Sequence, residues 1–268
     1  MLLSNKVVLI TGSTTGIGEA IAERSLAEGA LVMIHGRNEE RAQEIVNRHP
    51  KDRVKYSLAD LSHPEFSNLI IDDTLKAFGR IDVLINNAAS TERDDINTIT
   101  PASFEKIFNV NLKSPLFLSQ NAIHHFRQQK SGGVIVNIGS INAYCGQSNL
   151  LSYSISKGAM MTMTRNLAEE LGHEKIRVNQ INMGWTLTAN EEKLKQREGL
   201  PGNWADQVPA IFAPSGKLLT PEEVSYHVVF WASDTSAPAT GVVYELEQYP
   251  IIGRNLINEI QFSSLKKI

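Results

Sequence analysis

Short apolar runs alternate with longer amphipathic segments along most of the chain. The runs are four or five residues long and most are rich in Val, Ile and Leu, which predicts strands. Several runs are continuously apolar, as is typical of strands covered on both faces. The predicted strands are Val7–Ile10, Leu31–Ile34, Val54–Ser57, Val83–Asn86, Val134–Ile138, Arg177–Ile181 and Val242–Leu246. Their alternation with helix-length segments predicts an α/β fold, a doubly wound seven-stranded parallel sheet flanked by helices.

The segments between the strands carry helix-start signals and one long irregular stretch. Thr100 and Thr220 each precede a proline, and Glu223 completes a capping box with Thr220. Residues 184–219 contain three prolines and have no clear period. Irregular segments of this length in compact domains usually bind ligands, so we expect a substrate loop here. Residues 250–268 are expected to form a C-terminal extension of a single domain that takes up the whole chain.

Composition and charge exclude several kinds of partner and site. The 268 residues carry 26 Lys and Arg against 29 Asp and Glu, so the net charge is −3. This balance argues against nucleic acid or a membrane surface as the main partner, and no apolar run exceeds five residues. Cys145 is the single cysteine and the histidines lack metal-ligand spacing, so neither a disulfide nor a metal site is expected. We expect a cytoplasmic enzyme.

A glycine-rich turn, Thr11–Gly18, directly follows the first predicted strand and opens a helix. Glycines let the backbone approach a pyrophosphate, and the helix N-terminus favours its negative charge. This context predicts a dinucleotide site. At the end of the second strand, Arg37 and Asn38 stand where an acidic residue usually binds the ribose of NAD. Arginine suits a 2′-phosphate, so NADP(H) is favoured and NAD stays possible.

Tyr153 and Lys157 are four residues apart in a predicted helix and therefore share one face. A nearby ammonium, together with a positive cofactor ring, lowers the pKa of a phenol and makes it a usable acid or base. Ser140 follows the strand Val134–Ile138, at the edge where ligands of open α/β sheets bind. Asn111 stands in mid-helix, where asparagine has no advantage in propensity.

With these residues in place, the sequence resembles the short-chain dehydrogenase/reductase family over roughly residues 4–247. The matching pieces occur in family order, which makes the set far more specific than any one piece. They are Thr11–Gly18 (the TGxxxGxG turn), Asp60, Asn86-Asn87-Ala88, Asn111, Ser140, Tyr153 with Lys157 (the YxxxK pair) and Thr240-Gly241. The resemblance implies a single Rossmann domain that binds a nicotinamide cofactor.

The resemblance also implies roles for individual positions. Tyr153 would be the general acid or base, and Lys157 would bind the nicotinamide ribose and lower the pKa of Tyr153. Ser140 would orient the substrate oxygen, and Asn111 would hold a water that passes protons to Lys157. The cofactor would contact Gly12, Ser13, Thr15, Gly16, Ile17, Gly18, Arg37, Asn38, Asp60, Leu61, Asn87, Ala88, Tyr153, Lys157, Gly184 and Thr188.

Three positions depart from the family pattern. Ala89 replaces a glycine after Asn86-Asn87-Ala88, and Met183 replaces a proline before Gly184. Glu247-Gln248-Tyr249 replaces an Asp-Gly-Gly turn, which indicates a specialised C-terminal segment. None of these changes touches the four proton-handling residues.

The sequence therefore predicts an NAD(P)-dependent oxidoreductase acting on an alcohol or carbonyl small molecule. Ser140, Tyr153 and Trp185 are expected to contact substrate, and the aromatic and polar residues of the loop favour a polyol or sugar. One alternative is a 3-oxoacyl thioester reductase that acts on an acyl carrier protein. Another is a regulator that senses NADP(H) without turnover. The resemblance also implies a homotetramer or homodimer built on helices near residues 101–129 and 152–172.

Overall fold

Seven parallel strands form one sheet in a computed structural model that describes residues 1–250. Their order is β3-β2-β1-β4-β5-β6-β7, so the sequence order reverses between β1 and β4. Such a reversal opens a crevice at the carboxyl ends of the two strands. The predicted doubly wound fold is confirmed. The strands are β1 Val7–Ile10, β2 Leu31–Gly36, β3 Val54–Leu58, β4 Val83–Asn86, β5 Gly133–Ser140, β6 Ile176–Met183 and β7 Val243–Leu246.

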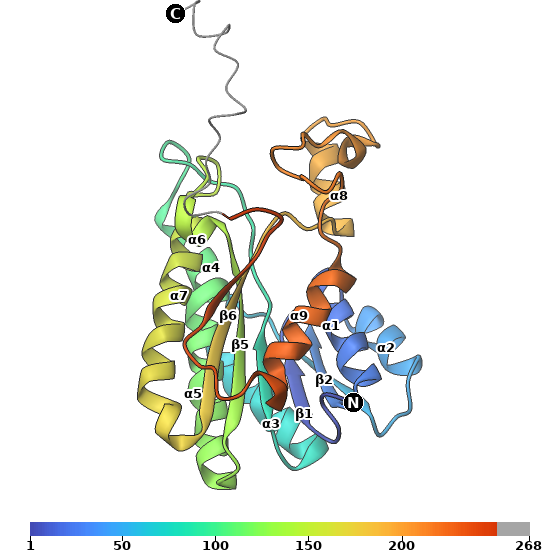
Figure 1. Ribbon diagram of the computed structural model, residues 1–268, viewed down its shortest axis with the longest axis vertical. Helices are drawn as coiled ribbons and strands as arrows, with labels where there is room; N and C mark the ends of the chain where they lie inside the picture. Colours follow the sequence, from blue (N-terminus) through green and yellow to red (C-terminus); the bar gives the residue numbers. More distant parts are fainter. Residues whose placement is uncertain (251–268) are drawn as a thin grey trace, which may run out of the picture.

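Helices cover both faces of this sheet (Figure 1). One face carries α1 Gly16–Ala27, α2 Glu39–Asn47 and α9 Pro221–Ala232. The other carries α3 Ser67–Phe78, α4 Pro101–Phe108, α5 Ser114–Gln129 and α7 Leu151–Leu171. The short helices α6 Asn142–Cys145 and α8 Ala189–Arg197 lie beyond the carboxyl ends of the strands (Figure 1). Single helical turns are η1 Pro64–Phe66, η2 Asn109–Lys113, η3 Gly172–Glu174, η4 Trp204–Gln207 and η5 Asp234–Ser236.

The continuously apolar strands fill two cores at once. In β1, the side chains of Val8 and Ile10 pack into the cluster beneath α1 and α9. Leu9 points to the opposite face and packs into the cluster beneath α3, α5 and α7. Side chains alternate along a strand, so a strand with helices on both faces needs apolar residues at every position. This is why β1 reads as an unbroken apolar run.

One local expectation was wrong. Residues 189–197, expected to be irregular, form helix α8, because the Thr188 hydroxyl caps it by accepting the Glu191 N–H at 3.1 Å. Acidic residues in its first turn and basic residues in its last turn complement the helix dipole. Asn111 lies in mid-helix as predicted, within η2, a π-helical turn that runs without a break from α4 into α5. Wider turns of this kind occur frequently at functional sites.

The predicted C-terminal extension, apart from Pro250, lies outside the described residues. Within residues 1–250, no helix has both the length and the apolar character needed to cross a bilayer. The same part of the chain holds no group of three or more His, Cys, Asp or Glu side chains placed to bind a metal ion.

Candidate active site

The glycine-rich turn joins β1 to α1 at the sheet's reversal point, and its shape requires glycine. Gly12 and Gly16 have φ values of +62° and +57°, in the region that side chains disfavour. A Cβ on Gly18 would lie 2.2 Å from the carbonyl oxygen of Gly12. The turn therefore presents bare backbone where a pyrophosphate would approach. Thr15, at the exposed N-cap position of α1, makes no side-chain capping bond, and Ile17 is half-buried beside it.

Thr11 and Asn87 hold this turn against the end of β4. The Thr11 hydroxyl accepts the N–H groups of Asn87 and Ala88, both at 3.0 Å. In return, the Asn87 amide donates to the carbonyls of Thr11 at 2.9 Å and Gly12 at 3.1 Å. The predicted cofactor residues Asn87 and Ala88 thus form one braced unit with the turn.

His35, which the sequence analysis did not single out, fixes the turn from the other side. Its Nδ1 accepts the Gly12 N–H at 3.2 Å, and its Nε2 lies 3.1 Å from the Ala59 carbonyl. Nδ1 as acceptor leaves the proton on Nε2, as a donor to Ala59. Burial lowers the pKa of His35 to about 4, so the ring is neutral at pH 7. The Ser13 hydroxyl is also buried here, between the Ile10 carbonyl and the His35 N–H.

Arg37 and Asp60 meet at the carboxyl ends of β2 and β3. The Arg37 guanidinium lies 3.5 Å from the Asp60 carboxylate, and the two side chains are 74% and 41% exposed. The Ser62 N–H bonds the Asp60 carboxylate, and this bond, with a smaller contribution from Arg37, lowers the pKa of Asp60. Asn38 caps α2 by accepting the Arg41 N–H at 2.9 Å. Leu61 packs in the core and its side chain is 4% exposed.

The predicted catalytic group assembles where β5 ends against α7. The Ser140 hydroxyl lies beside the Tyr153 phenol. Burial raises the pKa of Tyr153, and the neighbouring Ser140 hydroxyl opposes that shift. The Lys157 ammonium donates to the Ile138 carbonyl at 2.7 Å and lies 5.6 Å from the centre of the Tyr153 ring. Because Lys157 is fully enclosed, its pKa falls to about 8. Residues far apart in the sequence thus form one proton-handling unit.

Asn111 ties this unit to the loop after β4. Its Oδ1 accepts the Ser90 N–H at 2.7 Å, while its Nδ2 donates to the Ser90 carbonyl and to the Ser156 hydroxyl, both at 3.0 Å. Ser156 in turn donates to the Tyr153 carbonyl at 2.7 Å. The fully buried Asn111 side chain therefore joins the π-helical turn to the helix that carries Tyr153. That Asn111 also holds a water that passes protons to Lys157 stays a prediction.

Asp94 is a positioning residue that the sequence analysis missed. Helix α7 has no side-chain cap of its own, and Asp94 reaches its first turn from the loop after β4. One carboxylate oxygen accepts the Ser152 N–H at 2.9 Å, and the other accepts the Ser152 hydroxyl. A buried carboxylate at a helix N-terminus also complements the helix dipole. It fixes the backbone immediately before Tyr153.

Two tryptophans and a carboxylate gather after β6. Trp185 stacks on Trp204 with ring centres 5.3 Å apart, and its indole N–H donates to Glu191 at 3.0 Å. The Lys195 ammonium lies 5.5 Å above the Trp185 ring. The negative charge of Glu191 also contributes to raising the pKa of Tyr153, the predicted general acid. The sequence placed Trp185, Glu191 and Trp204 in the expected substrate loop, but it did not predict that they contact one another.

The start of α8 lies beside the glycine-rich turn. A Cβ on Gly16 would approach the Thr188 methyl to 3.6 Å, which places Thr188 near the predicted cofactor site. The Glu247 carboxylate occupies the space beside Gly184, and a Cβ there would lie 2.0 Å from it, so a side chain at this position would displace the carboxylate. The departure at Glu247 from the family's glycine turn thus adds a carboxylate against the end of β6.

Cys145, the single cysteine, is exposed on α6. Within the described residues, its thiol forms one hydrogen bond, to the Ile141 carbonyl.

Comparisons with known proteins agree with this geometry. Residues 6–199 match the family described as short chain dehydrogenase. The chain is 38% identical over 223 residues to the NADPH-dependent aldehyde reductase 1, chloroplastic, of Arabidopsis thaliana, with 77% of this chain and 74% of that protein covered. It is 34% identical over 262 residues to the glucose and ribitol dehydrogenase homolog of Oryza sativa subsp. japonica, with 89% and 83% covered.

A solved structure extends the likeness to three dimensions. L-Sorbose reductase from Gluconobacter frateurii, complexed with NADPH and L-sorbose, matches with a TM-score of 0.86 and 28% identity. The match covers 92% of this chain and 97% of the reductase. Together with the family match over residues 6–199, these relatives show that the chain belongs to the short-chain dehydrogenase family and is an NAD(P)-dependent oxidoreductase.

Proposed function

We propose that this enzyme moves a hydride between NADP(H) and a neutral polyol or sugar, with Tyr153 handling the proton. The observation that carries the proposal is the placement of the Tyr153 phenol beside the Ser140 hydroxyl at the end of β5, with the Lys157 ammonium 5.6 Å from the centre of the Tyr153 ring. Two hydroxyl groups at one point are suited to grip a single substrate oxygen.

Ser140, Tyr153 and Lys157 have separate roles in moving the proton. The Ser140 hydroxyl orients the substrate oxygen, and the Tyr153 phenol gives it a proton in reduction or takes one from the alcohol in oxidation. Burial raises the pKa of Tyr153, which keeps the phenol protonated and ready to donate. Lys157, with a pKa of about 8, both holds and releases protons near neutral pH. A bound nicotinamide coenzyme supplies the hydride chemistry.

The residues present fit a dinucleotide. Gly12 and Gly16, at positive φ, leave the turn without side chains at these points, and the turn leads directly into the N-terminus of α1, which favours an anion. Asp60 and Leu61 would border the adenine, and Thr188 and Gly184 the nicotinamide. Arg37 supports NADP over NAD, because its guanidinium is 74% exposed at the strand end where the ribose 2′ position is read.

The pair of Trp185 and Glu191 supports the polyol or sugar substrate. An indole face packs well on the apolar face of a sugar ring, and a carboxylate accepts hydrogen bonds from hydroxyl groups. The sorbose reductase was solved with L-sorbose, and the rice relative is named for glucose and ribitol. A Glu191→Gln variant should lose affinity for polyols because the amide accepts fewer hydrogen bonds, with little effect on coenzyme binding.

The test is a substrate panel followed by nicotinamide absorbance. Purified enzyme is offered L-sorbose, ribitol, glucose, a hydroxysteroid and a simple ketone, each with NADP(H) and with NAD(H). Turnover of the sugars and polyols with NADP(H) is the expected result. Turnover restricted to the steroid or the ketone would contradict the substrate class, and a preference for NAD(H) would contradict the coenzyme.

Apolar side chains on two helices support assembly into a homodimer or homotetramer. Leu116 and Phe117 on α5 are 40% and 37% exposed, and Ile155 on α7 is 48% exposed. Exposed apolar residues gathered on neighbouring helices commonly mark subunit contacts. Light scattering measures the mass: a monomer in solution would contradict this part of the proposal.

A further inference from the structure

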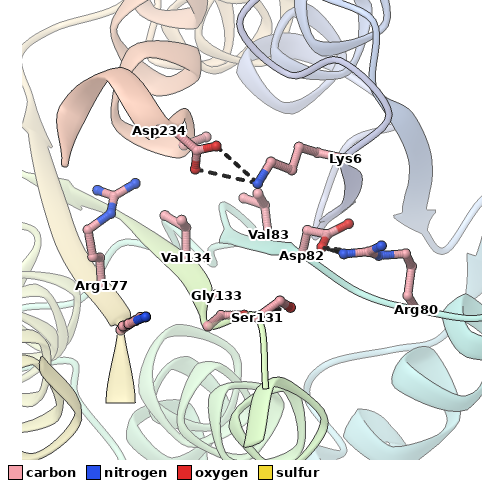
Figure 2. Close-up of a pocket in the computed structure, with 12 residues that line it drawn as sticks. Lys6, Arg80, Asp82, Val83, Ser131, Gly133, Val134, Arg177 and Asp234 are labelled. Carbon is pink, nitrogen blue, oxygen red and sulfur yellow. Dashed lines mark hydrogen bonds and ion pairs between the residues drawn. The ribbon is translucent and has the colours of Figure 1, made fainter. Parts of the chain in front are cut away.

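A polar cavity lies at the opposite end of the sheet from the predicted catalytic group. It opens beneath the first residues of β4, β5 and β6 and has a volume of about 90 Å³ (Figure 2). Gly133, which lines it, begins β5, whereas Ser140 ends that strand. Seven residue steps at 3.3 Å separate the two sites by roughly 23 Å. The cavity is therefore distinct from the active site.

Positive charge exceeds negative charge around this cavity. Four cationic side chains and two carboxylates line it, an excess of two positive charges: Lys6, Arg80, Lys175 and Arg177 against Asp82 and Asp234. Both carboxylates are already engaged. Asp234 pairs with Lys6 at 3.2 Å, and Asp82 pairs with Arg80 (Figure 2). The Asp82 carboxylate also accepts the Val7 N–H at 2.8 Å.

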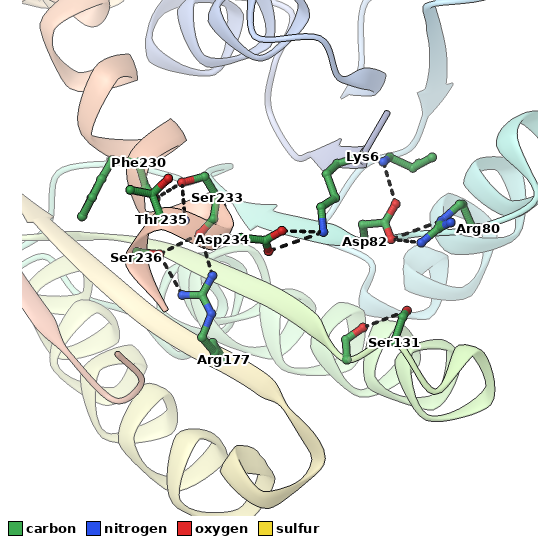
Figure 3. A network of polar contacts seen from close by, with 12 residues as sticks. Lys6, Arg80, Asp82, Ser131, Arg177, Phe230, Ser233, Asp234, Thr235 and Ser236 are labelled. Atoms are coloured by element: carbon green, nitrogen blue, oxygen red, sulfur yellow. Dashed lines mark hydrogen bonds and ion pairs between the residues drawn. The ribbon is translucent and has the colours of Figure 1, made fainter. Parts of the chain in front are cut away.

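Arg177 carries a buried charge with neutral partners. Its side chain is 9% exposed and donates to the Ser236 hydroxyl and the Ser233 carbonyl, both at 2.8 Å (Figure 3). No carboxylate of residues 1–250 forms an ion pair with Arg177 or with Lys175. Burial lowers the pKa of Arg177, and the charge of nearby Asp234 opposes that shift only in part. Buried charges normally pair with a counter-ion, and Arg177 has no such ion pair within the described residues.

The wall between these cations consists of bare backbone. Gly132 has a φ of +73°, and a Cβ there would lie 2.3 Å from the Lys175 carbonyl oxygen. A Cβ on Gly133 would collide with the Phe126 ring at 2.3 Å. These clashes show that packing requires glycine at both positions of the turn from α5 to β5, and the backbone of this turn lines the cavity.

We propose that this cavity binds a small inorganic oxoanion of the phosphate or sulfate type. A dianion would cancel the excess of two charges and give Arg177 the counter-ion that the protein does not provide. The oxygens of such an anion match guanidinium and ammonium donors in geometry. Bound there, the anion would join the starts of β1, β4 and β6 to the end of α9, and so stabilise the folded chain.

Inorganic phosphate is the probe, titrated calorimetrically into the full-length enzyme at constant ionic strength. Saturating NADP⁺ is present throughout, because the coenzyme site also recognises phosphate groups. Arg80→Gln combined with Lys175→Gln should weaken phosphate binding roughly tenfold or more, the scale of one lost charged hydrogen bond. Arg177 stays unchanged, since its bonds to Ser233 and Ser236 support the fold. Lys55→Gln, at an exposed lysine on β3, is the matched control and should bind like wild type.

A variant with the opposite sign completes the test. Asp234→Asn removes a repelling carboxylate and frees Lys6, so phosphate should bind severalfold more tightly. The site is refuted by either of two results in the presence of saturating NADP⁺: no phosphate binding, or equal affinity in wild type and the Arg80–Lys175 double variant. Weaker binding by Asp234→Asn would also overturn it. Each variant's unfolding curve confirms that the protein tested is folded.

Discussion

His35 makes the stability of this protein depend on pH in a calculable way. The unfolded chain takes up a proton at the ordinary histidine pKa of 6.5, whereas the folded chain does so only near 4. Between these values the unfolded state binds more protons, so the free energy of unfolding falls as the pH falls from 6.5 to 4. The difference of about 2.5 pKa units corresponds to a loss of about 3 kcal/mol.

Replacing the imidazole tests this reasoning. His35→Phe keeps a ring of similar size but leaves the Gly12 N–H and the Ala59 carbonyl unpaired, at about 1–3 kcal/mol each. Urea unfolding at a series of pH values should show a less stable variant that lacks the acid-dependent loss of about 3 kcal/mol. His173→Phe, at a side chain that is 77% exposed, is the control and should follow wild type. Parallel curves for wild type and His35→Phe would refute the role of His35.

Two further substitutions test the coenzyme site and the start of α7. Arg37→Ala should weaken NADP(H) binding by about 1.5–3 kcal/mol and leave NAD(H) nearly unchanged, as fluorescence titration of each coenzyme would measure. Equal weakening of both coenzymes would show that Arg37 does not read a 2′-phosphate. Asp94→Ala should lower the free energy of unfolding by about 1.5–3 kcal/mol, because the Ser152 N–H and hydroxyl lose a charged acceptor. Unchanged stability on urea unfolding would contradict the capping role.

The sheet was predictable because its signals are local. Several strands contain continuous apolar runs, β1 Val7–Ile10 among them, and the glycines of Thr11–Gly18 are required by backbone geometry within that turn. The strand ends were less predictable: β5 and β6 continue to Ser140 and Met183 because these residues pair with each other. Pairing depends on the neighbouring strand, and a single run of sequence does not reveal it.

The contacts that orient the candidate site could not be predicted, because they join distant segments. Asp94 caps a helix whose first turn lies 58 residues away, and His35 bonds a turn 23 residues before it. The carboxylate of Glu191 reaches Trp185 only because α8 forms, in a stretch that looks irregular by its prolines. Sequence patterns gave the residue types of the site, and tertiary packing decides which of them touch.

The proton-handling role of Tyr153 is the central claim, and a Tyr153→Phe variant tests it most directly. Removing the phenolic oxygen leaves the ring and the coenzyme turn in place. Turnover on the best substrate of the panel should fall by about 10²–10⁴-fold, the usual contribution of a general acid or base, while coenzyme affinity stays the same. Tyr56→Phe on β3, which removes a surface bond to Glu39, should keep full turnover. Wild-type turnover by Tyr153→Phe would contradict the account.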